Sequence, residues 1–132
     1  MEGPQRRHHG RRRWLRRAPP HACGAGKPYV LHFPASAAWI FGDTALKSGD
    51  RFSLAGIEID HRAAASPRGL RVLATILNVF GNGMTAEMSY YGTAKGAKVF
   101  AAGAFSLAGS IRYPDVRRVV ENLWTRLAVP NR

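Results

Sequence analysis

The sequence has little cysteine and no long hydrophobic run. Its single cysteine, Cys23, can form neither an internal disulfide nor a thiolate metal cage, which indicates a reducing compartment or indifference to redox state. We therefore expect a cytoplasmic protein. The longest nearly uncharged stretch, residues 99–111, is well short of the roughly 18 to 20 residues that span a bilayer. The sequence accordingly predicts no transmembrane helix.

Acidic side chains are also scarce, with 8 Asp and Glu against 20 Lys and Arg, so the net charge at pH 7 is +12. This charge is unevenly distributed. Residues 1–27 hold eight basic side chains against Glu2 alone, a charge of +7, which leaves +5 for the rest of the chain. Apolar residues become frequent only after this point. The chain therefore divides into a basic arm, residues 1–27, and a globular body, residues 28–132.

The arm has almost no aliphatic side chains, so we expect it to be disordered. Clustered arginines neutralise phosphates and release counterions, and one alternative function is therefore a small nucleic-acid-binding protein acting through the arm. An amino-acid sequence rich in Arg, Pro, Ala and Gly also results when GC-rich coding sequence is translated in a wrong frame or from upstream of the true start. This is a second explanation for the composition of the arm. The arginines of the nucleic-acid alternative are Arg6, Arg7, Arg11, Arg12, Arg13, Arg16 and Arg17.

The first half of the body is typical of β-structure. Residues 29–41 are apolar and predict one or two strands, and residues 52–60 alternate between apolar and acidic side chains with the period of a half-buried strand. The β-branched residues of the run 70–80 favour a strand, with a helix as the open alternative.

A hairpin is predicted further along the chain. Two short runs, residues 86–91 and 97–102, flank a five-residue connection, 92–96, that has glycine at both ends. The segment 99–102 is apolar at every position, and this pattern predicts a central strand that is covered on both faces.

The clearest predicted element is a C-terminal amphipathic helix over residues 115–128. Pro114 suits the first position of a helix, Asp115 favours the positive end of the helix dipole, and Pro130 ends the run. The apolar positions recur with helical spacing, so we expect this face to dock on the sheet and to bury both Val120 and Trp124, unless a partner chain that covers them is absent. These positions are Val116, Val119, Val120, Leu123, Trp124 and Leu127.

Candidate chemistry is sparse. Glu58, Asp60 and His61 form the one cluster of acids with a histidine, and such oxygen and imidazole ligands can hold iron or zinc. Strand alternation places His61 on the opposite face from the two acids, so a polar strand end is the competing interpretation. Tyr90 and Tyr91 are adjacent in a predicted strand and face opposite ways, which prevents them from acting as a pair. The residues alone assign no catalytic side chain and no metal ligand.

Three ordered blocks of the body form a recognisable pattern. They are AWIFGDTALKSGDRF at 38–52 with LAGIEID at 54–60, MSYYGTAKGAKVFAAGAF at 88–105, and NLWTRL at 122–127. Together they resemble the carboxyl-terminal region of the N,N-dimethylformamidase large (beta) subunit family. The first block departs from the family pattern at Ala45, where the family has glycine, and at Ile57, where it has an aromatic residue.

This resemblance implies an α/β fold, here a partial glutamine amidotransferase-like layered sheet with a C-terminal amphipathic helix. It also implies an amidohydrolase that cleaves a small formamide to formate and an amine. The full-length family uses a mononuclear iron held by two tyrosines and a glutamate, and a small alpha subunit accompanies the large one. The family's metal ligands lie upstream of the matched region, so Tyr90, Tyr91 and Glu58 are not assigned to iron.

The sequence is therefore interpreted as the C-terminal fragment of a dimethylformamidase-like amidohydrolase that is inactive alone. Its expected partners are the remaining domains or the small subunit of such an enzyme, and self-association is expected through uncovered apolar surface. A self-sufficient enzyme that uses Glu58, Asp60 and His61 is a further hypothesis, separate from both the fragment and the nucleic-acid alternative.

Overall fold

The computed structural model describes residues 27–53, 58–81, 83–104 and 106–128. Of the predicted arm, only Lys27 lies within these residues. No helix in the described part of the chain is long and apolar enough to cross a membrane. In chain order the elements are β1 (Tyr29–Leu31), the 3-10 helix η1 (Ala35–Phe41), β2 (Arg51–Phe52), β3 (Arg71–Ile76), β4 (Ala86–Gly92), β5 (Lys98–Ala101), α1 (Ser106–Gly109) and α2 (Pro114–Leu127).

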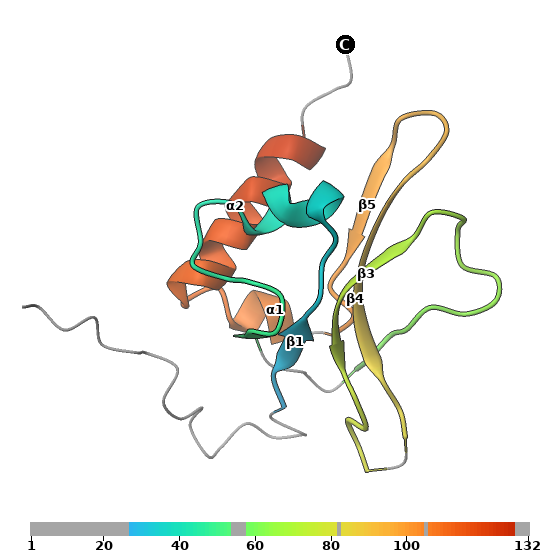
Figure 1. Cartoon of the computed structure of the whole chain (residues 1–132), viewed down its shortest axis with the longest axis vertical. Helices are drawn as coiled ribbons and strands as arrows, with labels where there is room; N and C mark the ends of the chain where they lie inside the picture. The colour runs from blue at the N-terminus through green and yellow to red at the C-terminus, as the bar shows by residue number, and fades with distance from the viewer. Residues whose placement is uncertain (1–26, 54–57, 82, 105, 129–132) are drawn as a thin grey trace, which may run out of the picture.

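The described strands form a five-stranded sheet in the order β2-β1-β3-β4-β5. Every pairing in it is antiparallel. Figure 1 shows two layers, with the sheet on one side and η1 and α2 on the other. We call the sheet face that η1 and α2 cover the inner face, and the opposite one the outer face. The predicted mixed α/β fold is confirmed at this level.

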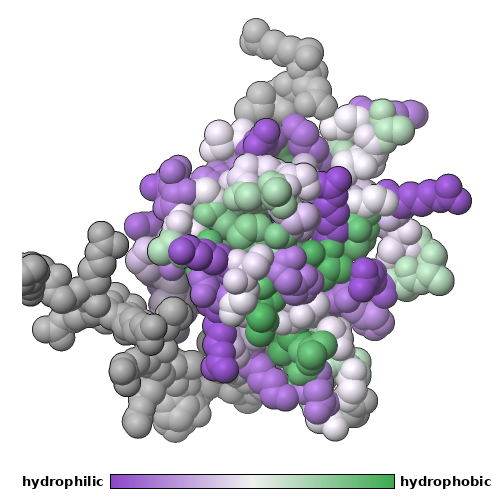
Figure 2. All heavy atoms as spheres, viewed as in Figure 1, coloured by the Kyte–Doolittle hydropathy of each residue, from purple (hydrophilic) through white to green (hydrophobic). Residues whose placement is uncertain are grey.

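The hydrophobic core lies between the inner face and the two helices. Leu31, Ala74 and Met88 are aligned across β1, β3 and β4 by the strand register, and all three are buried. From the helical layer, α2 buries Val116, Val119 and Leu123. On the face that Figure 2 shows, hydrophobic areas lie between hydrophilic side chains. The large apolar residues that stay exposed are Val30, Leu77, Phe80, Met84, Ile111, Tyr113 and Trp124.

The predicted C-terminal helix is confirmed as α2, with Pro114 in its first turn and Asp115 near its positive end. One flank of α2 is fixed to η1. The Asn122 Nδ2 atom donates hydrogen bonds to the carbonyl oxygens of Ile40, at 3.1 Å, and Gly42, at 2.8 Å. The Arg126 guanidinium lies over the Trp39 ring, 4.7 Å from its centroid. These contacts join residues that are about 80 positions apart in the sequence.

Residues 29–41 are only partly extended, so the prediction of one or two strands there is right for β1 and wrong for η1. Pro34 precedes η1 and fixes its own φ at −73°. The buried residues of η1 are Ala37, Ile40 and Phe41, which have the spacing of a helical turn and not the alternation of a strand.

The predicted strand over 52–60 is not continuous. Strand β2 ends at Phe52, because Ser53 has φ of 50° in the left-handed region. Pairing returns at Ile59, which forms an isolated bridge with Ala104. Ile57 lies outside the described residues. The predicted strand in 70–80 is confirmed as β3, and the predicted hairpin is confirmed as β4 and β5.

The prediction that 99–102 forms a central strand is wrong, because β5 lies at an edge of the sheet. Val99, Phe100 and Ala101 are each half-buried, and Phe100 packs against the core. The inner face of β5 is thus apolar because the helical layer covers it, although no further strand pairs with β5 among the described residues. In this single chain the Trp124 side chain is 74% exposed and Val120 is half-buried, so the sheet alone does not bury Trp124, and its burial by a partner chain stays a prediction.

Candidate functional site

The acidic segment 58–61 lies where β5 leaves the sheet. Ile59 pairs with Ala104, and the Asp60 N–H donates to the Gly103 carbonyl at 3.1 Å. On its other side, the Asp60 carbonyl accepts a hydrogen bond from the Glu87 N–H at 2.9 Å. The backbone at Asp60 is therefore held between β4 and the chain that follows β5. We call this place, where residues 58–61 and 102–104 pass against β4, the crossing.

Gly103 makes this crossing possible. It has φ of +69°, and a Cβ atom added there would lie 2.0 Å from the carbonyl oxygen of Glu87. Real Cβ atoms do not approach a backbone oxygen so closely, and the left-handed conformation adds strain for any other residue. Glycine at this position thus allows the chain after β5 to pass against β4.

An open hollow of about 470 Å³ lies at this crossing. Its described lining combines two acidic residues, Glu58 and Asp60, with small or apolar ones. Both acidic residues are exposed, so water solvates their charged groups. The lining residues are Glu58, Ile59, Asp60, Gly103 and Ala104.

The predicted candidate ligands do not converge on a point in the structure. The Asp60 Oδ1 atom accepts a hydrogen bond from the backbone N–H of His61 at 2.7 Å, and His61 itself is exposed. Across the described residues, no group of three or more His, Cys, Asp or Glu side chains could hold a metal ion. A mononuclear site commonly takes three converging protein ligands. The donors in this part of the chain therefore do not fit the iron that the resemblance implies for the full-length family.

Glu87 is a structural residue that the sequence analysis did not single out. It lies on the outer face of β4, and its side chain is only 11% exposed. Its carboxylate accepts a hydrogen bond from the Arg62 backbone N–H at 3.0 Å and forms an ion pair with the Arg62 guanidinium at 3.5 Å. The sequence pattern of the strand could have indicated this role, because Glu87 is the one acid of β4 and stands between two buried residues.

Tyr29 links β1 to the residue that precedes Gly103 in the chain after β5. Its buried hydroxyl donates a hydrogen bond to the Ala102 carbonyl at 3.0 Å. Burial raises the pKa of the Tyr29 phenol well above its ordinary value of 10.0, because the charged phenolate would lose hydration. The phenol is therefore a neutral hydrogen-bond donor at physiological pH.

The two adjacent tyrosines of β4 are placed as the alternation predicts. Tyr90 lies against η1, where its ring meets the Trp39 ring edge-on with centroids 5.6 Å apart. Tyr91 follows it in β4 and is on the opposite face of the sheet. The two phenols do not face a common point.

The arginines of the nucleic-acid alternative, Arg6 to Arg17, lie outside the described residues. That alternative, like the predicted disorder of the arm, stays a prediction.

The described fold is an antiparallel sheet backed by one long helix, a two-layer domain whose polar crossing is open to water. Residues 18–121 match the family model for the N,N-dimethylformamidase beta subunit-like, C-terminal domain. The match covers most of the chain, so this protein belongs to that family, and the resemblance is confirmed for the sequence blocks at 38–60 and 88–105. The block at 122–127 lies beyond the matched residues. The match begins within the last part of the predicted arm. No curated protein matches the sequence.

Proposed function

We propose that this chain acts as the C-terminal domain of a dimethylformamidase-like amidohydrolase and is inactive alone. The family match over residues 18–121 carries this proposal, since it spans all five described strands and the first half of α2. The parent reaction is hydrolysis of a small formamide to formate and an amine. This role is also consistent with two features of the domain. Its core is well packed, and the described residues at the crossing do not form a set of converging metal ligands.

The proposed contribution of the domain is structural. Hydrolysis of an unactivated amide needs a polarised carbonyl or an activated water, together with a base within hydrogen-bond reach. Glu58 and Asp60 are solvated, and the Asp60 carboxylate is engaged by the next backbone N–H. We therefore assign the iron and its ligands to the remaining domains of such an enzyme, with its small subunit as a further partner.

The proposal includes a larger glutamine amidotransferase-like layered sheet, to which this domain would add its own strands. Strand β5 supports this idea because it is an edge strand that carries half-buried apolar side chains. Edge strands present backbone N–H and C=O groups to a further strand. A cytoplasmic location is also part of the proposal and is supported by the single thiol, Cys23.

The isolated full chain should neither hold stoichiometric iron nor release formate from N,N-dimethylformamide above a protein-free control. The chain is purified with ferrous or ferric iron present, its metal content is measured by elemental analysis, and formate is followed over time. A variant with Glu58→Ala, Asp60→Ala and His61→Ala serves as the matched control and should give the same values. One iron per chain together with turnover that the triple variant loses would show a self-sufficient enzyme instead.

A further inference from the structure

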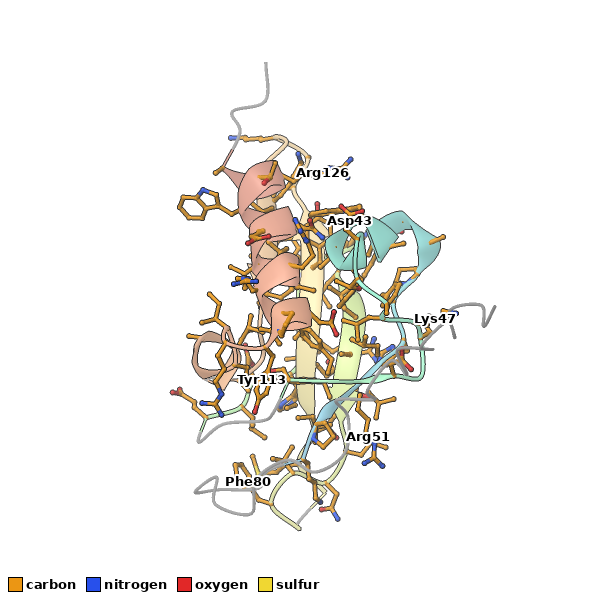
Figure 3. All side chains as sticks on the ribbon, turned by 90° about the vertical axis from the view of Figure 1, so that its left-hand side faces the viewer. Asp43, Lys47, Arg51, Phe80, Tyr113 and Arg126 are labelled. Carbon is orange, nitrogen blue, oxygen red and sulfur yellow. The ribbon has the colours of Figure 1, made fainter. Side chains whose placement is uncertain are left out.

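Helix α2 has three sides, and the described structure covers two of them. Val119 and Leu123 face the sheet, while Asn122 and Arg126 hold the flank beside η1. Figure 3 shows Arg126 on the side of α2 that faces η1. The third side carries Trp124, which is 74% exposed although it belongs to the apolar stripe of the helix. The stripe is thus wider than the surface that packs against it.

Charged residues of both signs lie beside Trp124 on this third side. The Glu121 carboxylate is 3.1 Å from the Arg118 guanidinium and 3.9 Å from that of Arg117. All three side chains are about half exposed or more. One carboxylate is therefore shared by two guanidinium groups, and each guanidinium keeps N–H donors for a second acceptor.

We propose that this third side of α2, with Arg117, Arg118, Glu121 and Trp124, is the contact surface of a symmetric dimer with a second copy of this chain. The two α2 helices run antiparallel, and the two-fold axis crosses this exposed side at the level of residue 119 along the helix. A two-fold axis requires that if one residue meets another, the reciprocal contact also forms. Glu121 of each copy then lies against Arg117 and Arg118 of the other.

The same register also gives Trp124 a contact. Trp124 lies five positions beyond the level of the axis on its own helix. The two-fold symmetry places it against the residues five positions before that level on the partner helix, which is the Pro114 end. Tyr113 is exposed there and adds a second aromatic ring. Tryptophan, tyrosine and arginine are the residues that contribute most of the energy in protein interfaces. This side of α2 therefore has both an aromatic anchor and charges that complement their own copy.

A second copy fits this surface better than an unrelated basic or acidic partner because its charges are mixed and self-complementary. Two chains of net charge +12 repel each other, so a stable contact needs local opposite charges at its centre, and Glu121 supplies them. The 14 residues of α2 span about 21 Å. One such helix buries less than the roughly 800 Å² per partner of a standard interface, so the dimer is weak and reversible.

Sedimentation equilibrium of the full chain from low to high micromolar concentration, at physiological ionic strength, should show a monomer–dimer equilibrium. Trp124→Ala should raise the dimer dissociation constant at least tenfold. Leu77→Ala removes a side chain of matched exposure, 72%, from the β3–β4 connection and should leave the constant unchanged. Figure 3 shows that this connection, marked by Phe80, lies at the far end of the molecule from Arg126.

Charge variants test the register and report on folding at the same time. Glu121→Arg makes the surface wholly basic, and Arg117→Glu with Arg118→Glu makes it wholly acidic, so each variant alone should be monomeric. An equimolar mixture should form a one-to-one heterodimer, which only folded chains can do. A monomeric wild type at high concentration, a dimer that persists in Trp124→Ala, or a mixture that stays monomeric would each overturn the proposal. None of these outcomes depends on the proposed enzymatic role.

Discussion

Replacing Gly103 with alanine is expected to lower the free energy of unfolding by about 3 kcal/mol or more, enough to unfold a marginally stable domain. The added Cβ atom would lie 2.0 Å from the Glu87 carbonyl oxygen, so the chain after β5 would have to move away from β4. That movement would also weaken the hydrogen bond from the Asp60 N–H to the Gly103 carbonyl. Urea denaturation followed by far-ultraviolet circular dichroism measures the loss.

Gly69→Ala provides the control for this experiment. Gly69 has φ of +83°, but nothing lies within 4 Å of the Cβ atom that alanine would add. This variant therefore carries only the cost of a left-handed backbone, about 1 to 2 kcal/mol. If Gly103→Ala is no more destabilising than Gly69→Ala, the close approach of the chain to β4 is not what requires glycine.

The second large effect is expected for Phe41→Ala, at about 3 to 5 kcal/mol of lost stability. Phe41 is 3% exposed and ends η1. Its ring stacks on Phe33 with centroids 4.2 Å apart, and it meets the Phe52 ring edge-on at 5.9 Å. The side chain therefore joins η1 to β2 and to the segment after β1, and its removal leaves a cavity among all three.

The comparison variant for Phe41 is Trp124→Ala, studied at a concentration where the chain is monomeric. Because Trp124 is largely exposed, its truncation should change the free energy of unfolding by less than about 0.5 kcal/mol. Equal destabilisation by the two substitutions would mean that the aromatic cluster around Phe41 is not a centre of the core.

Local sequence patterns were sufficient for the elements whose periodicity is strong. The apolar spacing in α2, and Gly92 and Gly96 at the ends of the predicted connection 92–96, each predict an element that the structure contains. The same patterns were insufficient for the position of β5, because an apolar strand can be covered by a helix on one face and still lie at a sheet edge. They also could not tell whether the sheet or a partner chain covers Trp124, since a stripe of apolar residues does not reveal how much of its width the core will cover.

The candidate site was harder to predict because long-range contacts form it. The Tyr29 hydroxyl binds a carbonyl 73 positions away, and Glu87 binds Arg62 across 25 positions. No local pattern indicates which distant backbone group such a side chain will meet. Gly103 likewise looks like an ordinary loop glycine in the sequence, and only the approach of Glu87 shows what it permits.

The most direct measurement of the central claim is a domain exchange in a longer dimethylformamidase-like large subunit. Its own C-terminal domain is replaced by residues 18–132 of this chain, which include the whole family match, and formate release and bound iron are measured in the purified enzyme. A structural role predicts that iron content is retained and that activity stays within about tenfold of the parent. The same exchange with Gly103→Ala should lose both. A soluble, assembled exchange enzyme that neither binds iron nor releases formate would contradict the claim.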